Sequence, residues 1–292
     1  FQKYQNILRY FDSLLLGLTA TPKDEIDRNT YNLFDLENKV PTYEYSLDQA
    51  VKDKYLVPFK ADQRELGFVE RGVAYDELSD EEKEQYENEP ELRDENGDLI
   101  DFISPDEVNK KLMNQDTIDL VLKHLMENGQ KIKGANELGK TLIFAQNQDH
   151  ARFIQERFDK NYPEEKGRFA SVITHEIPYV EKIKEEFSNS EKYPNIAISV
   201  DMLDTGIDIP DVVNLVFFRS VKSKVKFWQM IGRGTRLRKD LFGPGIDKKY
   251  FSVFDFGGNI RYFTVDHEDL ERDTTKPLSQ RIFNSRLKLL SS

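Results

Sequence analysis

The sequence contains no cysteine among its 292 residues. This absence excludes a disulfide framework, a thiolate nucleophile and a cysteine-ligated zinc site, and it fits a reducing compartment. No apolar run approaches the roughly 18 uncharged residues that a membrane helix needs. The four histidines have no metal-ligand spacing, so we assign them no catalytic role and expect no metal site. An initiator methionine and a signal-peptide pattern are also missing, and we expect a piece of a longer protein.

Basic residues are outnumbered, with 42 Lys and Arg against 53 Asp and Glu and a net charge of −11. Residues 70–101 alone hold 14 Asp/Glu and 3 Lys/Arg, which equals the whole excess. The remaining residues balance to about zero, so local basic patches and a nucleic-acid partner stay open. We interpret the acidic stretch as a solvated insertion, the alternative being an acidic flap that competes with DNA.

The sequence does contain short apolar runs that alternate with amphipathic stretches at helical spacing. Strands are predicted at 13–20, 41–46, 141–145, 169–174, 195–200, 212–218 and 249–256. Helices are predicted at 47–56, 106–129, 149–162, 178–188 and 224–237. This alternation predicts an α/β fold, a parallel sheet with helices on both faces. Ligands of such sheets bind beyond the carboxyl ends of the strands, so the loops that follow strands should carry the site.

Residues 134–141 match the phosphate-loop pattern G-x-x-x-x-G-K-[ST], with Lys140 as its lysine. In a working phosphate loop a strand leads in and a helix follows, so that backbone amides at the helix N-terminus hold the phosphates. Here a predicted helix leads in and a predicted strand follows. We therefore interpret the match as a surface loop. The run DFGG at 255–258 resembles a kinase metal-binding triplet, but no other kinase element accompanies it.

The segment QMIGRGTR at 229–236 places Gln229, Arg233 and Arg236 at helical spacings of three and four. Two guanidinium groups directed at one place suit a multiply charged anion such as a triphosphate. An arginine pair on a helix is more commonly a solvated face or part of an ion pair. Gly232 and Gly234 weaken that interpretation, because glycine costs helix stability and indicates a close approach to the backbone. The neighbouring Phe227 and Trp228 are expected to pack in the core rather than stack on bases.

The segment VDMLDTGIDIP at 200–210 follows a predicted strand. Its Asp201, Asp204, Thr205 and Asp208 surround Gly206. Taken alone, it reads equally well as an ordinary turn in which Asp and Thr bond their own backbone. Together with 229–236, about 25 residues further on, it is much more specific.

These two segments resemble motifs V and VI of superfamily-two helicases and translocases. GLTATP at 17–22 resembles motif III, and TLIFAQN at 141–147 resembles motif IV. More narrowly, residues 40–59 and 228–259 resemble the motor subunit of type I restriction enzymes. The resemblance implies a RecA-like second motor lobe together with the tail of the first. It divides the chain into the end of the first lobe and crossover (1–58), the second lobe with the acidic insertion (59–264), and the start of a helical region (265–292).

The resemblance also implies roles for individual residues. Arg233 and Arg236 match the arginine fingers that contact the γ-phosphate of ATP across the lobe interface, and Gln229 also faces the nucleotide. Positions implied to lie near the nucleotide, or to link its state to the other lobe, are Gly206, Asp208, Thr19 and Thr21. Candidate DNA contacts are Thr205, Thr174, Arg238 and Lys239. No Mg-ATP cradle precedes motif III, so this chain is not expected to hydrolyse ATP by itself.

The implied cofactors are ATP and Mg²⁺, held mainly by the first lobe. Double-stranded DNA and the modification (methyltransferase) and specificity subunits are the implied partners. The resemblance places the protein in a bacterial or archaeal cytoplasm. Three alternatives stay open: another superfamily-two helicase such as a repair enzyme, a self-contained phosphate-loop NTPase using Lys140, and a nucleic-acid-binding module. The last would use the basic residues Lys222, Lys224, Lys226, Arg233, Arg236, Arg238 and Lys239 to grip phosphates.

Overall fold

The structure of the chain is a computed structural model. It describes residues 10–19, 24, 25, 28–34, 36, 40–62, 73–78, 83, 87, 88, 93, 94, 97–103, 115–134, 136–177, 179–200 and 208–265. The predicted helical region at 265–292 lies outside these residues apart from its first position. Among the helices described, none has the length and apolar character needed to cross a membrane.

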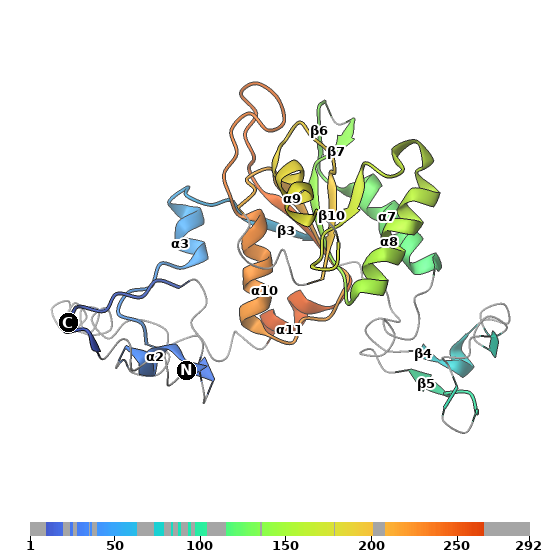
Figure 1. Cartoon of the computed structure of the whole chain (residues 1–292), viewed down its shortest axis with the longest axis horizontal. Helices are drawn as coiled ribbons and strands as arrows, with labels where there is room; N and C mark the ends of the chain where they lie inside the picture. The colour runs from blue at the N-terminus through green and yellow to red at the C-terminus, as the bar shows by residue number, and fades with distance from the viewer. Residues whose placement is uncertain are drawn as a thin grey trace, which may run out of the picture.

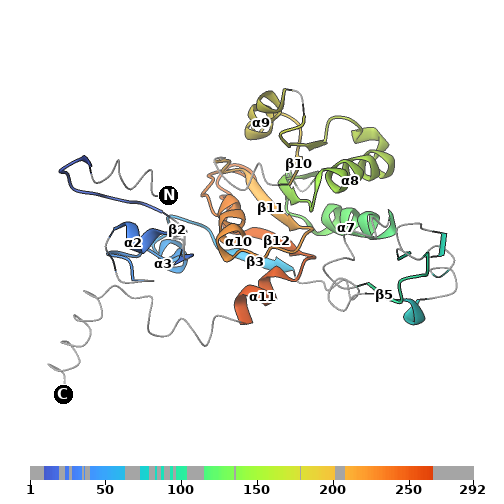
Figure 2. The same cartoon turned by 60° about the horizontal axis from the view of Figure 1, so that its bottom comes forward.

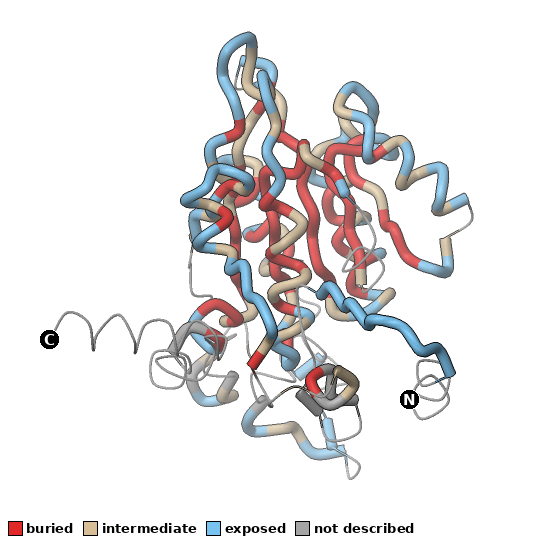
Figure 3. The backbone as a smooth tube through the Cα atoms, turned by 90° about the vertical axis from the view of Figure 1, so that its left-hand side faces the viewer, coloured by how far each residue is buried: buried red, intermediate tan, exposed pale blue. Residues whose placement is uncertain are grey.

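A six-stranded parallel sheet forms the centre of the protein (Figure 1). Across the sheet the strands are β3 (Phe59–Asp62), β12 (Phe251–Asp255), β11 (Val212–Phe217), β8 (Lys140–Phe144), β10 (Ile196–Ser199) and β9 (Ala170–Val172). Parallel neighbours cannot be joined by a hairpin, so helices connect most of them. The central strands are buried along their whole length, as Figure 3 shows.

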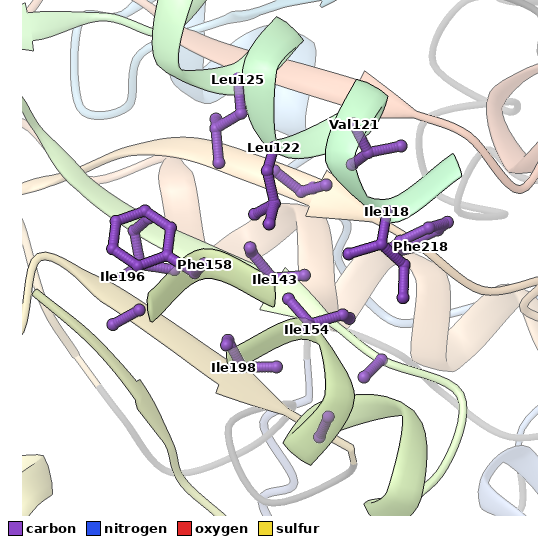
Figure 4. Packing of buried hydrophobic residues seen from close by; sticks show 14 of the residues in the cluster. Ile118, Val121, Leu122, Leu125, Ile143, Ile154, Phe158, Ile196, Ile198 and Phe218 are labelled. Atoms are coloured by element: carbon purple, nitrogen blue, oxygen red, sulfur yellow. The ribbon is translucent and has the colours of Figure 1, made fainter. Parts of the chain in front are cut away.

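Helices cover both faces of the sheet (Figure 2). One face carries α7 (Gln115–Asn128) and α8 (Gln148–Asn161), and the other carries α9 (Val180–Ser188), α10 (Lys224–Ile231) and α11 (Asn259–Val265). Each face has its own hydrophobic core, the first core under α7 and α8 and the second core under α9, α10 and α11. Side chains alternate along a strand, so Ile143 of β8 points into the first core while Leu142 and Phe144 point into the second. Figure 4 shows the first core, where aliphatic side chains of α7 and α8 meet β8 and β10. The predicted α/β fold with two covered faces is confirmed.

The remaining elements are short. They are β1 (Asp24–Glu25), β2 (Arg28–Asn29), α2 (Thr30–Leu33), α3 (Leu47–Lys52), β4 (Val73–Ala74), β5 (Phe102–Ile103), β6 (Lys131–Ile132) and β7 (Glu137–Leu138), with 3₁₀ turns η1 (Tyr75–Glu77), η3 (Pro163–Glu165) and η4 (Gly232–Gly234). Antiparallel pairs join β1 to β2, β4 to β5, and β6 to β7. Figure 1 shows β4 and β5 apart from the sheet. None of the described residues of the acidic stretch 70–101 is buried, in agreement with a solvated segment.

Two predicted strands are absent from the structure. Residues 14–19 have no regular structure, and Leu14, Leu16 and Leu18 are almost fully exposed. Residues 41–46 are likewise irregular, and their Ser46 caps α3 by accepting a hydrogen bond from Gln49 N at 3.2 Å. A strand forms only beside a partner that completes its backbone ladder, and within the described part of the chain neither segment has one. The edge strand β3 was not predicted, because its FKAD sequence is half exposed and lacks a clear apolar pattern.

A buried polar network holds together the edge of the sheet at which the strands begin. The side chain of Asn214 in β11 is fully buried, and its Oδ1 accepts a hydrogen bond from Gln130 N at 2.8 Å. Its Nδ2 donates to Gln130 O and to Thr141 Oγ1. The side chain of Gln130 in turn donates to Tyr250 O and Ser252 Oγ beside β12. This amino edge is therefore fixed in position.

Lys140 is part of the sheet and is not a phosphate-loop lysine. It is the first residue of β8 and is 2% exposed. Its Nζ donates to Lys192 O at 2.5 Å and Pro194 O at 2.8 Å. Burial lowers the pKa of Lys140 to about 8. The structure therefore contradicts the self-contained phosphate-loop alternative.

Replacing Lys140 by Met is expected to change how stability depends on pH. The unfolded chain holds the Lys140 proton up to its ordinary pKa of 10.5, whereas the folded chain releases it near 8. Within this window the unfolded state binds more protons, so raising the pH favours the folded wild type. In urea denaturation across the window, the free energy of unfolding should rise less steeply for Lys140→Met. The exposed Lys123→Met serves as control and should follow the wild type. Equal slopes for wild type and Lys140→Met would contradict this prediction.

Candidate functional site

Helix α10 leads into the segment 229–236. Its N-cap Ser223 accepts a hydrogen bond from Lys226 N, and the helix ends at Ile231. Phe227, Met230 and Ile231 lie on its buried face and pack against the sheet. Trp228 packs partly buried against the same core, so the expected core role of both aromatic residues is confirmed.

The helix ends earlier than predicted. Gly232–Gly234 form the 3₁₀ turn η4, and residues 235–237 are not helical. Gly234 lies against the ring of Phe251, where an added Cβ would stand 2.2 Å from Cδ2. Gly232 has open space where its Cβ would be. The close approach inferred for these glycines is therefore real at Gly234, but its cause is the protein's own core.

Gln229 and Arg233 lie one helical turn apart, and both are partly exposed. The Nε of Arg233 donates to the backbone oxygen of Gln229 at 3.2 Å. This bond holds the Nε end of the Arg233 guanidinium against the last turn of α10. The predicted proximity of these two residues is thus present in the structure.

Arg236 does not share the helical face with Arg233, because it follows the end of η4. Instead its Nε donates to Asp208 Oδ1 at 2.7 Å. The two side chains are 54% and 63% exposed, so the pair stands at the surface. The structure therefore brings together the end of the segment 200–210 and the end of the segment 229–236.

Arg238 and Lys239 follow directly. Arg238 Nε donates to the carboxylate of Asp211, which is 7% exposed. Lys239 is exposed. Arg238 is thus held by an acidic residue in addition to being a candidate DNA contact.

The residues of this site gather at the amino edge of the sheet. Gly234 packs on Phe251, the first residue of β12, and Thr235 O accepts a hydrogen bond from Val57 N just before β3. Asp208 lies four residues before β11 begins. We expected the site in the loops that follow the strands, at the carboxyl edge, whereas the candidate residues Asp208 and Arg236 lie near the amino edge. Helix α10 runs back across the sheet after β11, so its end returns to the edge where the strands begin.

Thr174 lies at the opposite edge. It follows β9, is 1% exposed, and its Oγ1 has no hydrogen-bond partner in the structure. Gln146 and Gln148, which follow β8, also carry a buried Oε1 without a partner. At about 3.3 Å per strand residue the two edges are on the order of 15 Å apart. Thr174 and the pair Arg238 and Lys239 are therefore not neighbours.

Several predicted positions cannot be compared with the structure. Thr21, Thr205 and Gly206 lie outside the described residues. Thr19 is described and is exposed within the irregular stretch 14–19.

The sequence pattern did not reveal Asp211 and Lys248. Lys248 is 3% exposed, and its Nζ donates to Pro210 O at 3.0 Å and to Val212 O at 2.6 Å. In the sequence Lys248 belongs to the polar run IDKK at 246–249, which indicates an exposed loop rather than a buried lysine. The DFGG run has a structural role, since Asp255 accepts hydrogen bonds from Asn259 Nδ2 and Ile260 N at the start of α11.

Residues 118–238 match the family described as the helicase conserved C-terminal domain. The match contains β8 to β11, α10 and η4, and hence both segments that meet at the amino edge. The parallel sheet with its two covered faces has the RecA-like fold, and the part of the chain that carries both segments is similar to helicase C-terminal domains.

Two curated relatives are endonuclease subunits of type I restriction enzymes. The endonuclease subunit of the type I restriction enzyme EcoKI from Escherichia coli (strain K12) is 28% identical over 270 residues, which cover 86% of this chain and 21% of the relative. The EcoAI endonuclease subunit from Escherichia coli is 26% identical over 273 residues, covering 91% and 31%. The chain is similar to the endonuclease subunits of these type I restriction enzymes, and it spans less than a third of the length of either relative.

A solved structure shares the fold. It is a fragment assigned to the HsdR subunit of a type I restriction enzyme from Vibrio vulnificus YJ016, with a TM-score of 0.60 and 24% identity. The match covers 94% of this chain and 44% of that one. The resemblance to type I restriction motors inferred from the motifs is confirmed.

Proposed function

We propose that this chain is the second motor lobe of a type I restriction endonuclease subunit and couples ATP hydrolysis to translocation along duplex DNA. The observation that most directly supports this proposal is the contact between Asp208 and Arg236, with Arg233 on the adjacent turn. It joins the segments that resemble motifs V and VI at one edge of a helicase C-terminal domain. Homology to the restriction subunits favours this motor over a repair helicase.

The chemistry proposed for this edge is electrostatic. Arg233 and Arg236 are partly exposed guanidinium groups next to a fixed backbone, which fits a polyphosphate anion. ATP, bound by a first lobe, would supply the phosphoryl group to be transferred, and Mg²⁺ would be held there too. Arg233 and Arg236 would hold negative charge that builds up on the phosphate oxygens. Gln229 would orient Arg233, and Asp208 would hold Arg236 until the phosphate competes for it.

The DNA contacts are proposed separately for the two edges. Thr174 would lie on a DNA track at the carboxyl edge, where its unpaired Oγ1 and the nearby glutamine oxygens indicate incomplete hydrogen bonding. This contact requires the buried Thr174 to be uncovered. Lys239 is exposed at the amino edge and would grip a phosphate there.

The remaining proposals follow from the relatives. The full-length protein would act in the cytoplasm with modification and specificity subunits, which would choose the DNA target. Hydrolysis by the chain alone is not expected, because Lys140 is committed to backbone oxygens and the fingers act on a nucleotide held by another lobe.

The test is ATP turnover by the 292-residue chain and by the full-length polypeptide that carries it, each with and without duplex DNA. We expect no turnover by the chain alone, and DNA-stimulated turnover by the full-length polypeptide in the presence of the modification and specificity subunits. Turnover by the chain alone that Lys140→Met abolishes would overturn the proposal. DNA-stimulated strand separation without those subunits would instead favour another superfamily-two helicase.

A further inference from the structure

A buried lysine bonded to the segments that follow Asp208 and Arg236 has no part in the mechanism above. Lys248 lies in the loop between η4 and β12 and is 3% exposed. Its ammonium donates to the carbonyl oxygens of Pro210 and Val212. Burial lowers the pKa of Lys248 to about 7, although the nearby Asp211 carboxylate opposes this shift. A buried amine is costly, so its presence calls for an explanation.

Lys248 closes a ring of contacts between three segments. Its two acceptor carbonyls flank Asp211, and the Asp211 carboxylate accepts a hydrogen bond from Arg238. The backbone N–H of Lys248 donates to Arg238 O at 2.9 Å. The ring therefore fixes the register of residues 210–212 against residue 238.

The exposed pair next to this ring includes a proposed finger. Asp208 lies three residues before Asp211, and Arg236 lies two residues before Arg238. An ion pair with both partners more than half exposed is weak, because water competes for both charges, and by itself it holds a long side chain poorly. The backbone two residues further on is held more firmly, because Arg238 is bonded to the buried Asp211 and to Lys248.

We propose that Lys248 is a positioning residue that acts through Asp211 and Arg238 to hold Arg236 opposite Asp208. This role rests on the proposed function, in which Arg236 contacts the nucleotide. A displacement of about 1 Å at such a group can lower the rate about 10²-fold without contact between the mutated residue and the substrate.

Lys140 provides a matched control. It too is a buried lysine at the amino edge, with a lowered pKa and two backbone oxygens as acceptors. Its acceptors, Lys192 O and Pro194 O, precede β10 and form no bond of the ring, although the charge of Asp211 also acts on Lys140. Replacing either lysine by Met removes the same chemical group, but only one of the two replacements opens the ring.

The experiment measures kcat and KM for ATP in the full-length polypeptide with its partner subunits and duplex DNA, below the melting temperature of each variant. Lys248→Met should lower kcat by about 10-fold to 10²-fold and leave KM within about 3-fold. Lys140→Met should leave both within about 3-fold. Asp211→Asn, which weakens the ring without removing the lysine, should act like Lys248→Met and replaces it if that variant does not fold.

A double-mutant cycle separates positioning from general stability. In an Arg236→Ala background, Lys248→Met or Asp211→Asn should lower kcat by less than about 3-fold, because the group they position is already gone. An equal loss in both backgrounds would overturn the positioning role. If Arg236→Ala alone left kcat unchanged, the proposed finger would itself be wrong, and this outcome is distinguishable from the first.

Discussion

Replacing Arg233 by Ala in the full-length polypeptide is expected to lower DNA-stimulated ATP turnover by about 10³–10⁵-fold. The guanidinium is held at the end of α10 by its bond to Gln229 O, and a guanidinium presents a planar fork of donors that matches a phosphate. A finger acts mainly on charge that develops in the transition state, so kcat should fall while ATP binding changes little. Steady-state turnover and equilibrium binding of a fluorescent ATP analogue measure the two effects.

The control for this experiment is Arg168→Ala. Arg168 is an exposed arginine that pairs with Glu165 of η3 and precedes β9, the strand at the opposite side of the sheet from β3 and β12. Its removal should leave turnover within about 2-fold, since exposed pairs contribute little. Arg233→Lys should stay well below wild type, because an ammonium lacks the planar fork of the guanidinium. A loss of less than about 10-fold for Arg233→Ala would remove Arg233 from the proposed mechanism.

Gly234→Ala is expected to destabilise the protein by about 3 kcal/mol or more, although glycine to alanine usually stabilises a helical turn. The new methyl group would stand 2.2 Å from Cδ2 and 2.6 Å from Cγ of the Phe251 ring. Phe251 is fully buried at the start of β12 and cannot swing into solvent. Urea denaturation of the 292-residue chain measures the change in the free energy of unfolding.

Gly232→Ala is the matched control, two residues earlier in the same turn. Its Cβ would meet no atom within 4 Å, and its φ of −55° suits alanine. It should be neutral or stabilise by up to about 1 kcal/mol. In a Phe251→Ala background the cost of Gly234→Ala should largely disappear. Equal effects of Gly232→Ala and Gly234→Ala would show that backbone freedom, rather than the contact with Phe251, explains Gly234.

Most of the sheet could be predicted because its central strands are continuous apolar runs. TLIFA, NIAISV and VVNLVFF are buried on both faces, and each lies within one or two residues of the observed strand. Burial on both faces requires apolar side chains at successive positions, and that requirement is visible in the sequence. The edge strand β3 has no such requirement, so its sequence gives little sign of it.

The wrong predictions have the same physical origin. The runs at 13–20 and 41–46 have the composition of strands, yet the described residues of neither pair with another strand. Composition reports what a segment could bury, whereas a strand also needs a neighbour to bond with. The prediction of one helix over 224–237 failed after Ile231 because the contact of Gly234 with Phe251 links residues far apart in the sequence.

The sequence by itself determined the α/β class, the decoy nature of residues 134–141, and the two segments that carry the proposed site. These follow from the order of apolar runs and from short motifs, which are local properties. Only the tertiary structure decided that the candidate residues lie at the amino edge, that Asp208 pairs with Arg236, and that Lys248 is buried against Pro210 and Val212. The physical reason is that these contacts join residues up to 38 positions apart, and they form only when α10 returns across the sheet.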